Sequence, residues 1–305
     1  MFVTFAGEEQ GLVGSTLMAA RMKKENQIIE AVLNNDIIGT EVAGNGRVGN
    51  TSVSVFSDDA LDSPSQQLAR YIHDVAERYI PAMKINNIFM TDRLGRGGDH
   101  TPFHLEGFAA IRFSTPNEIY ANQHRATDTL ENMSVPYTAR VARVNAAVAA
   151  SLATAPKPPV IMRTPGARGG TGHDGAARAG RDGDAASTDG AGRGAAGAAA
   201  GGRGPGGRRP GPTISRGSGY DAVLQWRAAG AEDSIKGYAV VIRATTAPFW
   251  EQEIYVGKVN QFTLKDVSID DAKFGVKAIG ADGQESLVSA YVYPPRQKTE
   301  IETVQ

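Results

Sequence analysis

The first fifteen residues, from Met1 to Ser15, have the sequence MFVTFAGEEQGLVGS. Residues 2–5 form an apolar run that predicts a buried β-strand. Glu8 and Glu9 follow this run directly, and open α/β sheets present functional groups at the carboxyl ends of their strands. Side chains of adjacent residues point in different directions, so we expect the two carboxylates to have separate roles. The stretch therefore predicts an α/β sheet with a functional edge.

The same residues bear on where the protein begins. They contain no basic region and no cleavage site, so they lack the features of a signal peptide. A mature domain rarely begins inside a buried strand, which indicates a start assigned too late or a fragment of a longer protein. We therefore expect the α/β sheet to lack its N-terminal part.

Residues 1–155 continue the alternation of strands and helices that is typical of an α/β sheet layered by helices. The clearest helix begins after Ser63, which can cap it, while Pro64 suits the first turn and Gln66 can complete a capping box. A second long helix is predicted over residues 136–152. Strands are predicted at residues 2–5, 30–35, 83–89 and 108–113.

The composition changes abruptly after residue 155. Residues 164–219 hold 19 of the 36 glycines and no aromatic residue, so they cannot bury enough apolar surface to fold. We predict that residues 156–219 are a disordered Gly/Ala/Arg-rich linker that tethers two folded parts. Nine Arg against four Asp in residues 163–216 leave RNA binding as an alternative, although aromatic residues for base stacking are missing.

A β pattern returns over residues 220–295, before a polar tail at residues 296–305. Six short strands in this space predict a small all-β sandwich. Trp226, Tyr238 and Leu264, with the strand that begins at Phe274, resemble a fibronectin type III module, in which a tyrosine usually stands at the position of Phe274. Such a module implies binding or spacing and no chemistry of its own. The strands are predicted at residues 222–226, 237–243, 253–256, 261–264, 274–279 and 287–293.

Composition excludes several classes of function. The 305 residues carry a formal net charge of −1, which argues against electrostatic attraction of the whole chain to nucleic acid or anionic membranes. The absence of cysteine removes disulfides, iron–sulfur clusters, thiolate zinc ligands and thiol nucleophiles. No window approaches the roughly 18 consecutive apolar residues that span a bilayer.

Four polar residues form the candidate site. Glu8 and Glu9 follow one apolar run, Asp36 follows another, and His124 lies in a polar loop. Carboxylate oxygens and an imidazole nitrogen are a donor set that suits zinc. Spacing alone leaves open the alternative that these are ordinary solvated side chains.

Four motifs in this order resemble family twenty-eight metallopeptidases, the family of the bacterial leucyl aminopeptidases and aminopeptidase Y. They are Phe5-Ala6-Gly7-Glu8-Glu9-Gln10-Gly11-Leu12-Val13-Gly14-Ser15, Asn34-Asn35-Asp36-Ile37-Ile38-Gly39, Gly98-Asp99-His100-Thr101-Pro102-Phe103, and Gln123-His124 with Asp128-Thr129-Leu130-Glu131-Asn132. The resemblance covers residues 2–152, about half of the chain. It implies a three-layer zinc-exopeptidase fold of the phosphorylase/hydrolase-like type.

The resemblance also implies a site of two zinc ions about 3.5–4 Å apart that share an activated water. Glu8 would be the general base, Glu9 and His124 would bind one zinc, and Asp36 would bind the other. The family takes a further histidine ligand and a bridging aspartate from motifs upstream of Gly-Glu-Glu, and this sequence has nothing there, so we expect an incomplete metal site. Gln123 stands where many members have a tyrosine, and its amide can still donate to an oxyanion.

Other polar residues have two interpretations each. Asp99 and His100 would line the pocket wall or form a simple turn. His104, four residues after His100, would complete a metal-binding pair on a helix or have no metal role. Arg112 would receive a substrate carboxylate or form a surface ion pair. Asp128 would orient the His124 imidazole or cap the following helix.

Two histidines have no predicted role in the chemistry. His73 lies off the apolar stripe of its helix and is expected to be solvated. His173 lies in the predicted linker.

The sequence therefore predicts a zinc-dependent aminopeptidase that acts on peptides, secreted or periplasmic by family resemblance. The alternative is a catalytically incomplete fragment that works by binding through its β-sandwich, to a polymer, a surface or a protein partner. The sequence does not fix the preferred N-terminal residue, aminopeptidase against carboxypeptidase action, or the oligomeric state.

Overall fold

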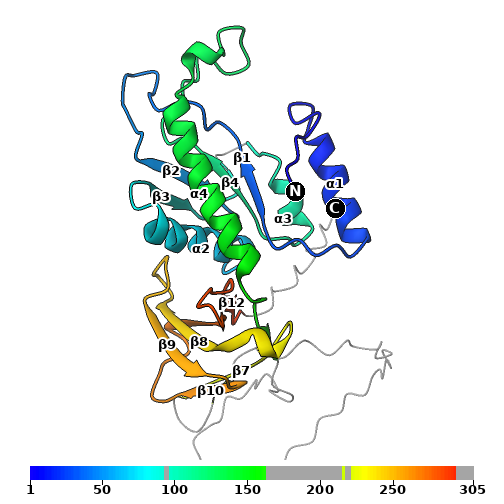
Figure 1. Cartoon of the computed structure of the whole chain (residues 1–305), viewed down its shortest axis with the longest axis vertical. Coiled ribbons are helices and arrows are strands. Elements are labelled where there is room, and N and C mark those ends of the chain that lie inside the picture. Colours follow the sequence, from blue (N-terminus) through cyan, green and yellow to red (C-terminus); the bar gives the residue numbers. More distant parts are fainter. Residues whose placement is uncertain (93–95, 163–214, 217–220, 293–305) are drawn as a thin grey trace, which may run out of the picture.

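The computed structural model describes residues 1–92, 96–162, 215–216 and 221–292 (Figure 1). Its N-terminal part is a four-stranded sheet with helices, and its C-terminal part consists of two further sheets. The N-terminal helices are α1 (Val13–Lys24), α2 (Pro64–Tyr79), α3 (Thr101–Leu105) and α4 (Val135–Thr154), with a short 3-10 turn at Leu130–Asn132. The N-terminal strands are β1 (Val32–Asn35), β2 (Ser52–Phe56), β3 (Lys84–Ile88) and β4 (Ala110–Ser114).

The N-terminal sheet is mixed, with the strand order β1-β4-β2-β3. β1 runs parallel to β4, and β4 runs antiparallel to β2. Asn35 pairs with Phe113, so β1 and β4 end at the same edge of the sheet. The loops that follow these two strands, which begin at Asp36 and Thr115, therefore start side by side.

Side chains of β4 alternate between the two faces of the sheet, as the two-residue period of a strand requires. Ile111 and Phe113 belong to the large core that α2 and α4 cover. Ala110 faces the other way and packs with Ala19 of α1 and Phe103 of α3. The sheet is therefore covered by helices on both faces, and the predicted α/β class is confirmed (Figure 1).

Helix α2 begins where the capping signal predicts. Ser63 Oγ accepts a hydrogen bond from the backbone N–H of Gln66 at 3.0 Å. The Gln66 side chain reaches back one residue further than in a capping box, because its Oε1 accepts from the N–H of Asp62 at 3.1 Å. Two side chains, those of Ser63 and Gln66, therefore each accept a hydrogen bond from a backbone N–H at the start of the helix.

Replacing Ser63 with alanine is expected to lower the free energy of unfolding by about 1 kcal/mol, since one helix N–H loses its acceptor. Urea unfolding followed by circular dichroism measures this change. Ser63→Thr keeps the hydroxyl and serves as the control. An alanine variant as stable as the threonine variant would contradict the capping role.

Two predictions about strands differ from the structure. Residues 1–5 form no strand; Phe5 lies with its ring centroid 6.0 Å from that of Phe103, beside α1 and α3. An apolar run becomes a strand only where a neighbouring strand pairs with it, and no described strand does so here. Conversely, β2 forms in a stretch for which no strand was predicted, although Val53 and Val55 alternate with serine in the two-residue period of a strand.

The C-terminal part has its strands close to the predicted positions. One sheet has the order β10-β7-β5, with β6 also paired to β7, and the other has the order β12-β11-β8-β9. Both sheets contribute to one core around Trp226, Tyr238 and Phe274. The likeness to a fibronectin type III module stays a prediction. The strands are β5 (Val160–Ile161), β6 (Ser215–Arg216), β7 (Ala222–Arg227), β8 (Ile235–Ala244), β9 (Gln252–Gly257), β10 (Gln261–Leu264), β11 (Ala272–Gly280) and β12 (Ser289–Ala290), with a 3-10 turn at Glu232–Ser234.

Strand β5 changes the boundary of the predicted linker. Ile161 pairs with Trp226, so this segment belongs to the C-terminal sheets although composition placed residues 156 onward in the linker. The low-complexity signal comes from residues further along, whereas Val160 and Ile161 have the β-branched side chains of a strand. Residues 163–214, with His173, and the tail at 296–305 lie outside the described residues.

The C-terminal sheets pack directly against α2 and the turn before it. The Arg243 guanidinium binds both carboxylate oxygens of Asp62, at 2.7 and 2.8 Å. Trp250 Nε1 donates to Gln67 Oε1 at 3.1 Å. Leu287 is buried within the core of the N-terminal part. The two parts therefore share an interface, which the predicted tether did not require.

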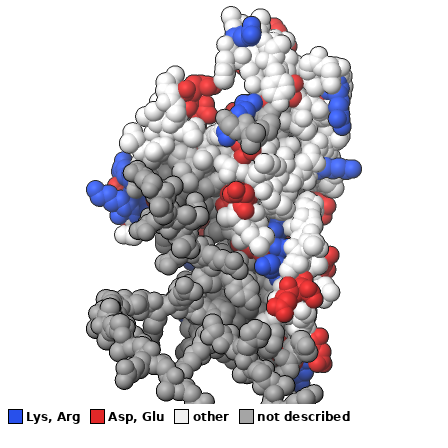
Figure 2. All heavy atoms as spheres, turned by 180° about the vertical axis from the view of Figure 1, so that it is seen from behind, with Lys and Arg blue, Asp and Glu red and all other residues white. Residues whose placement is uncertain are grey.

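The surface of the described residues shows charges of both signs. Figure 2 shows Lys and Arg interspersed with Asp and Glu over the face opposite to that of Figure 1, where the described atoms are visible. Within the described ranges, no helix has the length and apolar character needed to cross a bilayer. The described atoms that are visible in this view form no continuous basic patch.

Candidate active site

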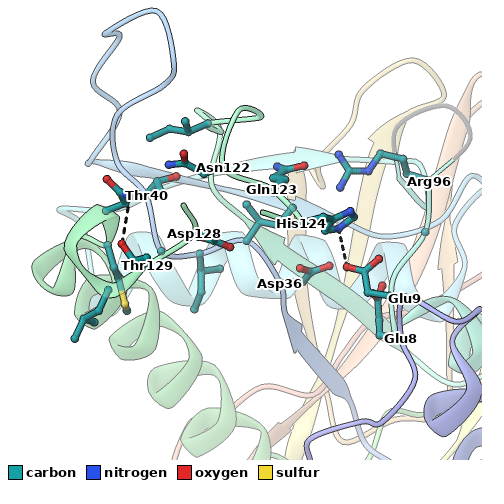
Figure 3. A pocket seen from close by; sticks show the side chains of 18 of the residues that line it. Glu8, Glu9, Asp36, Thr40, Arg96, Asn122, Gln123, His124, Asp128 and Thr129 are labelled. Atoms are coloured by element: carbon teal, nitrogen blue, oxygen red, sulfur yellow. Dashed lines mark hydrogen bonds and ion pairs between the residues drawn. The ribbon is translucent and has the colours of Figure 1, made fainter. Parts of the chain in front are cut away.

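A cavity of about 840 Å³ opens at the edge where β1 and β4 end. Its walls come from four segments: the turn before α1, the loop after β1, the segment just before α3, and the loop between β4 and α4. Figure 3 shows Glu8, Glu9, Asp36 and His124 pointing toward one another in it. The four residues singled out in the sequence, which lie as many as 116 positions apart, thus converge on one cavity.

The glycine-rich turn before α1 places Glu8 and Glu9. Gly7 has a φ of +72°, a conformation that residues with a Cβ rarely adopt. Gly14 lies so close to Ala6 that a Cβ would stand 2.7 Å from the Ala6 carbonyl oxygen. The chain therefore folds back tightly here, and the two carboxylates emerge at the rim of the cavity.

Glu9 and His124 form a direct pair. His124 Nε2 lies 2.6 Å from Glu9 Oε1, and both side chains remain more than half exposed. His124 has a φ of +56°, in the left-handed region that few residues other than glycine occupy. The loop thus turns sharply at this histidine, with its imidazole against the carboxylate.

Asp36 enters the cavity from the end of β1. Its backbone N–H donates to the Phe113 carbonyl at 3.1 Å, which continues the pairing with β4. Its carboxylate oxygen Oδ2 lies 3.2 Å from Nε of Arg112. Burial raises the pKa of Asp36, while the positive charge of Arg112 opposes this shift.

Glu8 has an environment suited to a proton acceptor. Burial is the main cause that raises its pKa, and the negative charges of Asp36 and Glu9 act in the same direction. A carboxylate whose pKa lies closer to neutral pH is a stronger base than an ordinary solvated one. Glu8 thus has a raised pKa, and Glu9 has a direct contact with His124.

The donor set is suited to zinc in its chemistry but is incomplete in number. Glu9 and His124 offer a carboxylate and an imidazole to one centre, and Asp36 offers one more carboxylate. Catalytic zinc sites use three protein ligands. In the described ranges, no group of three or more His, Asp or Glu side chains is close enough to hold a metal ion. The residues present would supply part of a zinc site.

The wall near His124 contains a polar pair that the sequence did not reveal. Gln123 Nε2 donates to Glu118 Oε2 at 2.6 Å. Arg96 lines the cavity with its guanidinium 3.8 Å from the same carboxylate. Glu118 is buried, so this pair holds the Gln123 amide in one orientation. No motif marked Arg96 or Glu118, since their proximity arises from the fold alone.

Asp99 and His100 lie outside the lining of the cavity. His100 is fully buried, and its Nε2 lies 2.7 Å from the Thr91 carbonyl oxygen. Burial lowers the pKa of His100 to about 3, so the ring is neutral and donates this hydrogen bond. The two interpretations of Asp99 and His100, as part of the pocket or as a turn, both stay predictions.

The imidazole of His104 is also buried and hydrogen-bonded to the backbone. Its Nε2 lies 2.6 Å from the Ala110 carbonyl oxygen, and burial lowers its pKa. Its ring meets that of His100 edge-on, with centroids 5.0 Å apart. In the described part of the chain, these two histidines belong to no metal-binding group.

The structure also bears on the predictions for Arg112, His73 and Asp128. Arg112 is completely buried, so the expected surface ion pair is wrong. His73 is only partly solvated, because its ring stacks on Phe249 with centroids 4.4 Å apart and leaves 21% of the side chain exposed. Asp128 lines the cavity, and its role in orienting His124 or capping a helix stays a prediction.

Comparison with known proteins shows which family the N-terminal part resembles. Residues 1–149 match the sequence profile of Peptidase family M28. A "Probable zinc metalloprotease" of Pyricularia oryzae is 32% identical over 318 residues, which cover 94% of this chain and 53% of the relative. Another protein of that name in Leptosphaeria maculans is 29% identical over 316 residues, which cover 95% and 61% of the two chains.

A zinc aminopeptidase from Bacillus subtilis is similar in structure over 48% of this chain and 34% of its own, with 24% identity and a TM-score of 0.37. The chain spans about half the length of the curated relatives named first. The profile match covers all four residues that converge on the cavity. Residues 1–149 of this chain are therefore similar to peptidase family M28.

Proposed function

We propose that this chain is part of a zinc-dependent exopeptidase that removes N-terminal residues from peptides. One observation carries the proposal: Glu8 lies beside the Glu9–His124 pair in the cavity that Asp36 also lines. The family of residues 1–149 and the names of the fungal relatives support zinc and peptide hydrolysis. Two zinc ions, as the motifs imply, are part of the proposal.

Glu9 and His124 would hold one zinc ion, and Asp36 would hold a second. Bound zinc would supply a Lewis acid that polarises the scissile carbonyl and lowers the pKa of a water molecule. Glu8 accepts a proton from the attacking water and passes it to the amine that leaves. Gln123, held by Glu118 at 2.6 Å, has a second amide N–H available for the developing oxyanion.

The roles of Glu8 and Glu9 can be separated by experiment. Glu8→Gln is expected to keep the zinc content and lower kcat by roughly 10²–10⁴-fold, the usual contribution of a general base. Glu9→Gln and His124→Ala are expected to lower zinc affinity itself. The measurements are metal analysis and hydrolysis of aminoacyl p-nitroanilides, made on the 305-residue chain and on the protein isolated from its own cells.

Glu25→Gln is the matched control, because Glu25 is a glutamate in a solvent-exposed pair with Arg21 at the end of α1. It should change neither zinc content nor rate. A zinc-loaded protein that hydrolyses no aminoacyl substrate, or a Glu8→Gln variant with full activity, would contradict the proposal.

The alternative is a binding protein that acts through its C-terminal sheets. The shortage of zinc donors among the described residues favours it. It predicts that the protein from its own cells carries no zinc and that every partner contact maps to residues 221–292. Zinc-dependent hydrolysis that Glu8→Gln abolishes would rule it out.

A further inference from the structure

Arg112 has an unusual position for a charged residue. It lies on β4 opposite Asn34 of β1, and its side chain is completely buried. Its Nη1 forms an ion pair with Asp92, a carboxylate that is equally buried, and its Nε lies 3.2 Å from Oδ2 of Asp36. A charged side chain is found in such a place only when it is paired.

The carboxylates of Asp92 and Asp36 differ in their exposure to solvent. Asp92 is closed off from solvent, whereas about a third of the Asp36 side chain is exposed, at the cavity. Arg112 therefore joins an anchor inside the protein to a residue that lines the site.

We propose that Arg112 is a positioning residue, which holds the Asp36 carboxylate oriented toward the cavity. The inference rests on the proposed function, because it gives Asp36 the task of binding a metal ion. Carboxylates that ligate a metal are commonly held by a second polar group, and loss of that group lowers metal affinity.

The surroundings of Arg112 restrict its movement. A Cβ on Gly98 would lie 3.4 Å from Cδ of Arg112, so the backbone passes close to the arginine stem. The ring of Phe56 stands 5.8 Å from the guanidinium carbon. Arginine fits this place better than lysine because its planar guanidinium brings Nη1 to Asp92 and Nε to 3.2 Å from Asp36 Oδ2 at the same time. The single ammonium group of a lysine in the same space could pair closely with only one of the two carboxylates.

The first test is zinc affinity, measured by calorimetric competition with a chelator. Arg112→Lys keeps the positive charge beside Asp92 and is expected to fold, yet to lose the contact with Asp36. We expect its zinc affinity to fall by about 10–100-fold, as for other groups that hold a metal ligand. Arg112→Met should lower it at least as far.

Arg243→Met is the control, because Arg243 is also buried and paired, with Asp62, away from the cavity. It should destabilise the fold and leave zinc affinity unchanged. Asp36→Asn should lower the affinity. Unchanged zinc affinity in both Arg112 variants, beside a clear loss in Asp36→Asn, would overturn the inference.

A second test needs no metal. Urea unfolding of Arg112→Lys, Asp36→Asn and the double variant gives the coupling between the two side chains. We expect the unfolding constant of the double variant to differ at least about twofold from the product of the single effects. Additive effects would show that Arg112 does not hold Asp36. If the wild-type protein binds no zinc, the proposed function fails, and this cycle still decides the contact.

Discussion

Replacing Asp62 with asparagine is expected to lower the free energy of unfolding by about 3–5 kcal/mol, the usual cost of removing one partner from a buried ion pair. Asp62 is buried and lies between two buried arginines. Arg243 binds both of its oxygens, and Arg70 Nη1 lies 3.2 Å from its Oδ1. Without the carboxylate, two guanidinium groups would stand together with no negative charge between them.

The neighbouring contacts explain why the cost is high. Burial is the main cause that lowers the pKa of Arg70, to about 10, while Asp62 acts in the opposite direction. The ring of Trp250 lies 5.8 Å from the Arg70 guanidinium carbon and 5.5 Å from that of Arg243. Little water is therefore available to solvate either charge once Asp62 is neutral.

Asparagine is the informative substitution at this position. Asp62 has a φ of +55°, which asparagine tolerates and alanine does not, so Asp62→Asn changes charge without adding backbone strain. Asp59→Asn, an exposed aspartate in the same loop, is the control and should change stability by less than about 0.5 kcal/mol. Urea unfolding measures both variants, and equal stability of the two would contradict the network.

The same network bears on how the chain unfolds. Asp62 and Arg70 belong to the N-terminal part, whereas Arg243 lies on β8 of the C-terminal sheets. If the interface couples the two parts, the fluorescence of Trp226 and Trp250, which both lie in the C-terminal part, should follow the same transition as the helices of the N-terminal part. An Asp62→Asn variant with two separate transitions would show that this carboxylate joins them.

Acid is expected to destabilise the protein through His100. Burial lowers its pKa in the folded chain to about 3, against an ordinary value of 6.5. Below pH 6.5 the unfolded chain binds a proton that the folded chain does not, so stability falls as pH drops from 6.5 toward 3. The contribution from this residue reaches roughly 3 kcal/mol at pH 4, at about 1.4 kcal/mol for each pH unit. Above pH 6.5 the protonation of His100 has no effect on stability, because the imidazole is neutral in both the folded and the unfolded chain.

Comparing the pH dependence of stability of the wild type with that of His100→Gln isolates the contribution of His100. Glutamine can still donate to the Thr91 carbonyl but takes up no proton. Asp58, Asp36 and Glu8 have raised pKa values and stabilise the fold as pH falls, so the wild-type curve alone is a sum of opposite effects. Unfolding in urea at pH 7, 5 and 4 should show a steeper loss in the wild type than in the variant. Parallel curves would mean that His100 is not buried in its neutral form.

Some features followed from local sequence. Helix α2 begins after Ser63 because a hydroxyl acceptor and a proline in the first turn act within a few residues. The strands of the C-terminal part lie close to their predicted positions for the same reason, since alternation and turn residues are local signals. The ordered motifs also indicated correctly that Glu8, Glu9, Asp36 and His124 meet in one cavity.

Other features depended on contacts between distant residues. Whether residues 2–5 become a strand depends on a pairing partner, which no local pattern specifies. Arg112 follows an apolar run and resembles a surface arginine in the sequence, yet Asp36 and Asp92 hold it inside. Asp62 and Arg243 are 181 positions apart, with the whole low-complexity segment between them. Such charges are stable in the interior only when the fold supplies the opposite charge, and only the tertiary structure shows that it does.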